Sequence, residues 1–231
     1  MKTSIFLLQT TLFCLLCCAT TMRGQTVWGV FPTIDASIGL NEKNNIGLYH
    51  FAAVPLQSIQ GDVGAGVLLY YAEQSFNHAF TDNTTLTGAY VYQAENPGTK
   101  GEVHEQRGHV QLKQSFNLGS NEVQLRLRSD NRFIRTSFSD KFQFQHRGRL
   151  LAGWSRTFNK WKIYAYEEAF FNTPSSASPY FAENWAALQF NRSISNRSSI
   201  EFGPLYITWK TGPSAWFHQL YGQFTYVVKL R

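Results

Sequence analysis

Cysteine and long hydrophobic runs are both scarce in this sequence of 231 residues. The three cysteines are Cys14, Cys17 and Cys18, so all of them lie close to the N-terminus. If that segment is removed, neither a disulfide framework nor a thiolate metal site is available. A lipid anchor on Cys18 is an alternative use, although Cys17 stands where such an anchor expects a small residue. After this region no segment approaches the roughly 18 consecutive apolar residues of a transmembrane helix.

The N-terminal segment itself has the pattern of a secretory signal peptide. Lys2 precedes an apolar run over residues 5–19, and small and polar residues follow it. The run is shorter than the roughly 20 apolar residues of a membrane-spanning helix. We therefore expect residues 1–24 to be a signal peptide, with a second possible cleavage position after Ala19. Residues 25–231 are then one domain, which suits a chain of this length.

Charge and aromatic content further limit the class of protein to which this chain can belong. The chain has 21 Lys and Arg against 15 Asp and Glu, and Lys2 and Arg23 leave with the signal peptide. This modest excess excludes a typical nucleic-acid-binding protein. Aromatic residues make up 16% of the chain although mean hydropathy is only −0.26. A closed β-barrel is the arrangement without helices that satisfies every backbone hydrogen bond in lipid, and this composition favours it.

Alternation with a period of two supports this interpretation. Between residues 122 and 132, Val123, Leu125 and Leu127 alternate with polar and charged residues. Residues 142–155 and 219–230 repeat the pattern, with one apolar face and one polar face. Such alternation is typical of strands that face lipid on one side and a polar lumen on the other.

Turn signals divide the chain into segments long enough to cross a bilayer obliquely. About eleven strands are expected, near residues 27–39, 46–56, 64–75, 84–94, 103–116, 121–134, 141–156, 160–171, 180–193, 198–209 and 215–230. Bacterial barrels usually have an even number of strands, so we expect ten or twelve. Prolines at 32, 55 and 204 weaken three of these assignments, because proline cannot donate to a ladder.

The turns themselves fall into two sets. Short turns are expected over residues 41–45, 117–121, 157–160 and 195–197. Longer connections, or ones richer in Gly, Pro and Ser, are expected over residues 57–62, 95–101, 172–179 and 210–214. Barrels of this kind combine short periplasmic turns with longer external loops, so we assign the second set to the outer surface.

A cluster of charged residues is expected on the inner faces of the strands. Its members are Glu105, Arg107, Glu122, Arg126, Arg128, Asp130, Arg132, Arg147, Arg149, Glu168 and Glu183. Unpaired charges in a confined interior cost several kcal/mol each, so opposite charges on neighbouring strands should pair. The cluster is then a structural lattice that fills a narrow barrel. An alternative is a constriction that favours anions, since rings of Arg or Lys select anionic solutes.

The tryptophans have two interpretations. Those that we expect at the membrane interfaces are Trp28, Trp154, Trp161, Trp209 and Trp216. Trp154 and Trp161 flank a short turn, and Trp209 and Trp216 flank a longer one, so both pairs lie where a strand leaves the bilayer. The alternative is that these rings are platforms on which a ligand stacks.

Two further classes stay open as alternatives. Some small barrels hydrolyse or transfer acyl chains with Ser and His on the wall, but the six histidines show no Ser-His spacing or G-x-S-x-G elbow. His104 and His109 fall on opposite faces of one strand, so they could not bind one metal ion together. We therefore predict no metal site, and without a catalytic motif we predict no catalytic residue and no cofactor. The second alternative is a soluble secreted β-sandwich that acts as a binding module, because its strands alternate in the same way.

Several short motifs resemble an outer-membrane barrel family called domain of unknown function 2490. They are Trp28, the pair Glu105 and Arg107, residues 125–132, 146–150 and 166–172, Phe181, and Glu183 with Asn184. The chain departs from that pattern at Trp185, where an arginine is usual, and at its last two residues, where an aromatic is common. The resemblance implies a barrel in the outer membrane of a Gram-negative bacterium and implies no activity. Expected partners are outer-membrane lipid, lipopolysaccharide and the barrel-assembly machinery during biogenesis, and no nucleic acid.

Overall fold

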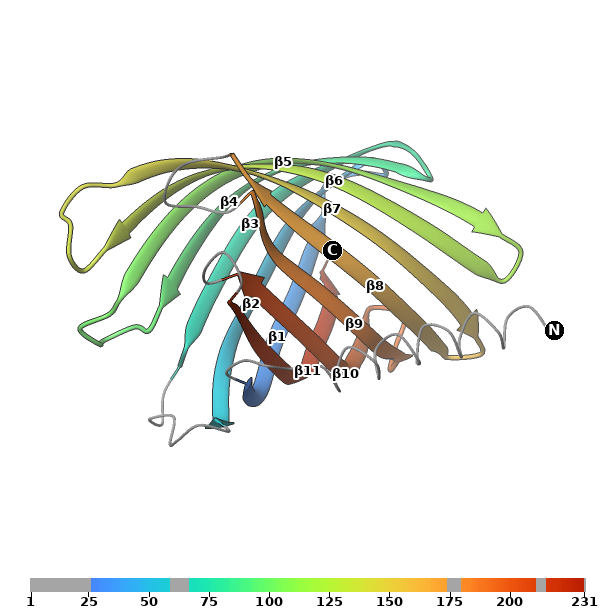
Figure 1. Cartoon of the computed structure of the whole chain (residues 1–231). Helices are drawn as coiled ribbons and strands as arrows, with labels where there is room; N and C mark the ends of the chain where they lie inside the picture. Colours follow the sequence, from blue (N-terminus) through green and yellow to red (C-terminus); the bar gives the residue numbers. More distant parts are fainter. Residues whose placement is uncertain (1–25, 59–66, 174–179, 211–214, 231) are drawn as a thin grey trace.

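The computed structural model describes residues 26–58, 67–173, 180–210 and 215–230, which form a barrel of eleven strands (Figure 1). The expected signal peptide lies outside these residues. The strands are β1 Thr26–Gly39, β2 Asn44–Ser58, β3 Leu69–Thr81, β4 Thr84–Glu95, β5 Val103–Leu118, β6 Asn121–Thr136, β7 Gln143–Phe158, β8 Trp161–Asn172, β9 Phe181–Ser193, β10 Ser198–Lys210 and β11 Trp216–Leu230. None of the described residues forms a helix that could cross a membrane. The all-β class and the barrel are therefore as predicted, and the two-sheet sandwich is wrong.

Each strand pairs with the next in the sequence, and β1 closes the barrel against β11. Successive pairs are antiparallel, whereas β1 and β11 run parallel, in register from Thr26 opposite His218 to Ile38 opposite Leu230. Figure 1 shows this seam, with β1 in blue beside β11 in red. The expectation of an even strand number is wrong. In an up-and-down barrel an odd number makes the first and last strands run in the same direction, so the closing pair must be parallel.

The two sets of turns lie at opposite ends of the barrel. Strand direction alternates, so the connections after β1, β3, β5, β7 and β9 share one end and the others share the opposite end. The first set is short, and in it Gly119 and Asn159 take positive φ. The second set includes residues 96–102 and 137–142. The expected short turns at 41–45, 117–121, 157–160 and 195–197 lie in the first set, and the expected longer connection at 95–101 lies in the second. The other expected connections, at 57–62, 172–179 and 210–214, lie largely outside the described residues.

The wall has an apolar outer face and a mixed inner face. Large exposed hydrophobic residues on the outer face include Ile34, Val110, Leu127, Phe144 and Phe224. Between them along the strands lie the buried polar and charged residues that point inward. This is the reverse of a water-soluble protein, in which charged groups face solvent and apolar groups are enclosed.

The inside of the barrel is divided into two halves. Strands β5 to β8 carry its buried arginines and carboxylates. The other half is apolar and aromatic, with a core of Phe31, Phe51, Ala53, Tyr71, Val91, Ala187, Leu205, Ile207 and Tyr221. The candidate site lies where these two halves meet.

Candidate functional site

The eleven charged residues predicted from the sequence all fall on inward positions of β5 to β9. Paired positions across the ladders share a face, and Arg107 lies opposite Arg132, Arg128 opposite Arg149, and Glu168 opposite Trp185. Because side chains alternate along a strand, charges spaced two residues apart in the sequence line up on one surface. The structure brings eight of them into one connected set of ion pairs, the charged lattice, while Arg147 with Glu183 and Glu122 with Lys162 form separate pairs at its edges.

Glu105 holds the first part of the charged lattice together. Its carboxylate accepts from Arg107 Nε at 2.7 Å and is held by Arg132 Nε at 2.7 Å and Nη2 at 2.6 Å. The Glu105 side chain is only 2% exposed. Arg107 also donates to Gln93 at 3.2 Å. One buried carboxylate therefore pairs with two buried guanidinium groups, and Arg107 also lies 3.6 Å from the Asp130 carboxylate.

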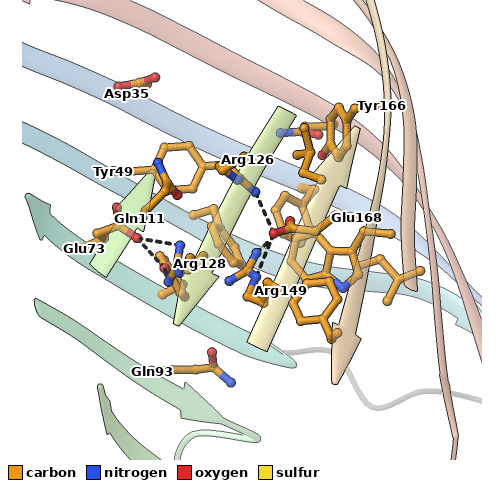
Figure 2. A pocket seen from close by; sticks show the side chains of 18 of the residues that line it. Asp35, Tyr49, Glu73, Gln93, Gln111, Arg126, Arg128, Arg149, Tyr166 and Glu168 are labelled. Atoms are coloured by element: carbon orange, nitrogen blue, oxygen red, sulfur yellow. Dashed lines mark hydrogen bonds and ion pairs between the residues drawn. The ribbon is translucent and has the colours of Figure 1, made fainter. Parts of the chain in front are cut away.

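Asp130 and Glu168 extend the charged lattice across three strands. Arg128 Nε donates to Asp130 at 2.6 Å. Arg149 binds Glu168 through two parallel hydrogen bonds of 2.8 and 2.7 Å, and Arg126 reaches the same carboxylate at 2.7 Å. Figure 2 shows Arg126 and Arg149 converging on Glu168. Such bidentate pairs fix orientation as well as charge, so the inner ends of these side chains are held in place.

Two carboxylates at the edges have weaker surroundings. Glu183 binds Arg147 at 3.3 Å, and Arg147 also donates to Asn172 at 2.8 Å. Glu122 lies near the short-turn end with Lys162 at 3.0 Å, and its side chain is 30% exposed. The sequence did not single out Lys162 as a partner. The Glu122–Lys162 pair is partly exposed to solvent and contributes less than the buried pairs, whereas Arg147 is buried.

Aromatic side chains join the charged half to the apolar half and reach across the lumen. Phe51 stacks on Phe31 at 4.3 Å and on Tyr71 at 4.6 Å, and its ring lies 6.5 Å from Trp185 on β9. Tyr71 accepts from Arg128 of β6 at 3.3 Å. Contacts between strands that are not neighbours show that side chains fill the barrel at this level.

Alternation along the sequence did not predict this aromatic layer. Inward positions were expected to be polar, whereas Phe31 and Phe51 are apolar residues that point into the lumen. Alternation alone cannot distinguish the two faces of a strand when both are apolar. Cross-strand spacing of aromatic residues at shared inward positions is the signal that could have identified the layer.

The remaining space is a cavity of about 1080 Å³. Ten Lys and Arg side chains line it against six Asp and Glu. Glu105, Glu122 and Asp130 pair with those cations, so the charges in the interior nearly balance. Asp35 also lines this space, apart from the ion pairs in Figure 2. Among the described residues, no group of three or more His, Cys, Asp or Glu could hold a metal ion.

The tryptophans do not all lie on the same face. Trp28 is exposed on the outer face, and the pairing of Trp154 with Val123 and the contact of Trp161 with Phe202 place these two rings there as well. Trp216 contacts Phe181 on the same face.

Trp209 differs from the expectation that it lies at the membrane interface. It lines the cavity, packs against the apolar core and stacks on Phe217 at 4.7 Å. On β10 it shares an inward face with Leu205 and Ile207, so an apolar residue of this strand can point into the barrel.

The chemistry of the interior is that of a charge-paired barrel. Its buried arginines are engaged by carboxylates, amides or a phenol, which leaves the lattice itself few free groups for catalysis. The histidine inside, His109, lies 3.9 Å from Glu73 and is 4% exposed. His104 points to the opposite face of the same strand, where it pairs with Tyr92 at 2.9 Å.

No curated protein matches the chain. One family model matches residues 69–217, which include β3 to β10 and all eleven residues of the predicted charge cluster. The match covers more than half of the chain, and so the protein belongs to the family described as protein of unknown function, DUF2490.

Proposed function

We propose that this protein is an outer-membrane barrel of a Gram-negative bacterium whose lumen is closed by the charged lattice and the aromatic layer. The observation that carries the proposal is the inverted distribution of side chains. Leu127 is 59% exposed on the outer face, whereas its neighbour Arg128 is 8% exposed inside. A wall of this kind suits hydrocarbon outside, because a large exposed apolar surface is unfavourable in water.

Outward aromatic residues lie near both ends of the wall, which supports a wall that spans a membrane. Trp28 and Trp216 lie at one end of the wall, and Trp154 and Trp161 lie towards the other. Tyr206 pairs with His218 at 2.7 Å on the outer face near the longer connections. Amphipathic rings are favoured at both membrane interfaces, so these residues would lie at the level of the lipid headgroups.

The proposal includes export and insertion. Residues 1–24 would direct the chain out of the cytoplasm, and the barrel-assembly machinery would fold residues 25–231 into the outer membrane. Membrane lipid and lipopolysaccharide would then cover the apolar wall. The lumen would contribute stability, because its arginines and carboxylates neutralise each other inside a narrow barrel.

A second candidate is a narrow path for anions along the lumen. The cavity of about 1080 Å³ and its ten cationic side chains favour this candidate. The near balance of charge and the aromatic contacts across the lumen favour the closed lattice. Single-channel recording from the reconstituted barrel separates the two: the lattice predicts no current above background, and the path predicts a small current carried by anions.

The proposed function as a whole is tested by migration in detergent gels. The purified chain without residues 1–24 should migrate differently before and after heating, as a folded barrel does, and should need an amphiphile to stay monomeric. A chain that stays folded and monomeric in plain buffer contradicts the proposal. Proteins of similar size that are known to be soluble serve as the control for the heating step.

A further inference from the structure

A band of polar residues interrupts the apolar outer face of the β6–β7 hairpin. Four consecutive outward cross-strand pairs run along it towards the longer connections: Leu127 with Leu150, Ser129 with Gly148, Asn131 with His146, and Phe133 with Phe144. The first and last pairs are exposed and apolar. The two middle pairs carry a hydroxyl, an amide and an imidazole. In a wall that faces hydrocarbon, uncompensated polar groups are unfavourable, so this band needs a physical reason.

A hydrogen-bonded series joins two side chains of the band, Ser129 and His146, to Thr173, which follows β8. Ser129 Oγ lies 2.9 Å from His146 Nε2. On the other side of the ring, Thr173 Oγ1 lies 3.3 Å from His146 Nδ1. The Thr173 backbone N–H donates to the His146 carbonyl oxygen at 2.9 Å, which fixes the two residues relative to each other. With its proton on Nδ1, the ring donates to Thr173 and accepts the Ser129 hydroxyl proton at Nε2.

The surface beside Ser129 is open. Gly148 stands opposite Ser129, and a Cβ added there would meet nothing nearer than the Phe171 carbonyl oxygen at 4.0 Å. Gly108 stands opposite Asn131 on β5, and a Cβ there would meet nothing within 4 Å. The missing side chains leave room for another molecule to reach the hydroxyl from the side of the wall.

We propose that Ser129 and His146 form a serine acyl-hydrolase site for the carboxylic esters of membrane lipids, with Asn131 as the donor to the oxyanion and Thr173 as a positioning residue. A nucleophile, a base in hydrogen-bond contact and a third group that orients the base are the arrangement that acyl transfer needs. The choice of lipid rests on the proposed function, in which this face contacts the bilayer. Lipid acyl chains would lie along the exposed apolar pairs on either side.

The reaction proceeds in two steps. Ser129 Oγ bonds to the carbonyl carbon of the ester while His146 Nε2 takes the hydroxyl proton, and the Asn131 amide donates to the oxyanion. The bond from carbon to the alcohol oxygen then breaks, and His146 returns the proton to that alcohol, which leaves as the deacylated lipid. Water next attacks the acyl-serine while His146 takes one proton. The bond from carbon to Oγ then breaks, His146 returns the proton to Oγ, and the fatty acid leaves with the Ser129 hydroxyl restored.

Other histidines of the outer face serve as matched controls. His104 and His218 also make hydrogen bonds there, at 2.9 Å and 2.7 Å, but their partners are the phenols of Tyr92 and Tyr206. These pairs lack an aliphatic hydroxyl that could act as the nucleophile. Replacement of His218 should therefore leave acyl chemistry unchanged while altering the same kind of surface pair.

Covalent labelling tests the nucleophile. The folded barrel in detergent micelles is treated with an alkyl fluorophosphonate, and mass spectrometry locates the adduct. The expected adduct is on Ser129 in the wild type and in His218→Asn, with none in Ser129→Ala and at least about a hundredfold slower labelling in His146→Asn. Ser129 is exposed, so Ser129→Ala should fold, and heat-modifiable migration verifies this for each variant. A folded wild type that acquires no adduct on Ser129 overturns the proposal.

Hydrolysis tests the substrate class. A diacyl phospholipid in mixed micelles should release fatty acid, and Ser129→Ala or His146→Asn should lower the rate at least about a hundredfold. Release that is equal in the wild type and Ser129→Ala overturns the proposal, as does a wild type that hydrolyses neither the phospholipid nor p-nitrophenyl butyrate. Hydrolysis of p-nitrophenyl butyrate without release from phospholipid overturns the lipid assignment. If the chain proves soluble in plain buffer, the proposed function fails, but a Ser129 adduct still identifies the nucleophile.

The role of Thr173 needs a separate measurement. Thr173→Val removes the partner of His146 Nδ1 and should lower kcat about tenfold or more and shift the pH profile of kcat/KM, because the tautomer is no longer fixed. Thr173→Ser keeps the hydroxyl and should restore both. An unchanged pH profile in Thr173→Val overturns the positioning role. A purely structural role would lower the folded fraction of both variants without moving the profile.

Discussion

Among the buried charges of the lumen, Glu105 is a carboxylate that two arginines share. It is the shared acceptor of Arg107 and Arg132, and the three side chains are almost fully enclosed. Loss of one partner of a buried ion pair leaves an uncompensated charge, which costs far more than the loss of an exposed pair. In the charged lattice, one substitution at this carboxylate affects two guanidinium groups.

Glu105→Ala is therefore expected to lower the free energy of unfolding by about 3–5 kcal/mol. Glu122→Ala is the matched control, because its partner Lys162 is 40% exposed and such pairs contribute less than about 1 kcal/mol. Urea titration of the barrel in detergent micelles, followed by heat-modifiable migration, measures both. Equal losses in the two variants would contradict the lattice as the source of stability in the lumen.

Sequence alternation was sufficient to place the charged residues but not the residues that depend on contacts between strands. The eleven predicted charges face inward because they follow the period of their strands. Trp209 was placed on the wrong face because β10 is apolar on both sides. Ser129 and His146 are 17 residues apart, and only the register of β6 against β7 brings them together.

At the scale of strands, hydrogen bonds between polar side chains of neighbouring strands explain why the bounds of β3 were predicted poorly. β3 was expected over residues 64–75 and runs from Leu69 to Thr81. Its second half pairs through polar inward residues: Asn77 donates to Asn45 at 2.9 Å and accepts from Thr87 at 2.7 Å. Cross-strand hydrogen bonds hold this part in the sheet without the apolar alternation on which the prediction relied.

The parallel seam is the element that sequence patterns could not reveal. The count of about eleven segments was correct, but the rule that bacterial barrels have an even number of strands argued against it. Closure depends on how β1 meets β11, which are nearly 200 residues apart in the sequence. Each strand has a free edge until the other covers it, and uncovered edges are unfavourable in lipid.

A pair of cysteines across the seam tests its register. Ile34 and Tyr226 are outward Cα partners on β1 and β11, and neighbouring strands lie about 4.8 Å apart. Ile34→Cys with Tyr226→Cys should form a disulfide, detected as altered migration in a non-reducing gel. Ile200→Cys with Tyr226→Cys is the positive control across the antiparallel β10–β11 pair.

The negative control shifts one cysteine along β11. Ile34→Cys with Leu230→Cys places the thiols about 13 Å apart along the strand, too far for a disulfide. Oxidation of the shifted pair, or failure of the Ile34 and Tyr226 pair while the β10–β11 control succeeds, would contradict the parallel register.

At the scale of the whole molecule, the odd number of strands places the start of β1 and the end of β11 at opposite ends of the barrel. β1 starts at the end of the barrel that carries the longer connections, and β11 finishes at the end that carries the short turns. The strand-forming part of the chain therefore begins at one end of the barrel and finishes at the other. If the longer connections face outward, the end of β11 at Leu230 lies on the periplasmic side.

This sidedness can be measured in intact cells with a maleimide that does not cross membranes. The chain has no cysteine after Cys18, so single cysteines at exposed positions of the two ends report separately. Thr99→Cys lies in a longer connection and Lys160→Cys lies in a short turn. Thr99→Cys should react in intact cells, whereas Lys160→Cys and a cysteine after Leu230 should react only once the outer membrane is opened, because the bilayer separates the two ends. Reaction of both variants in intact cells would mean that the wall does not cross a membrane, and the reverse pattern would mean that the short turns face outward.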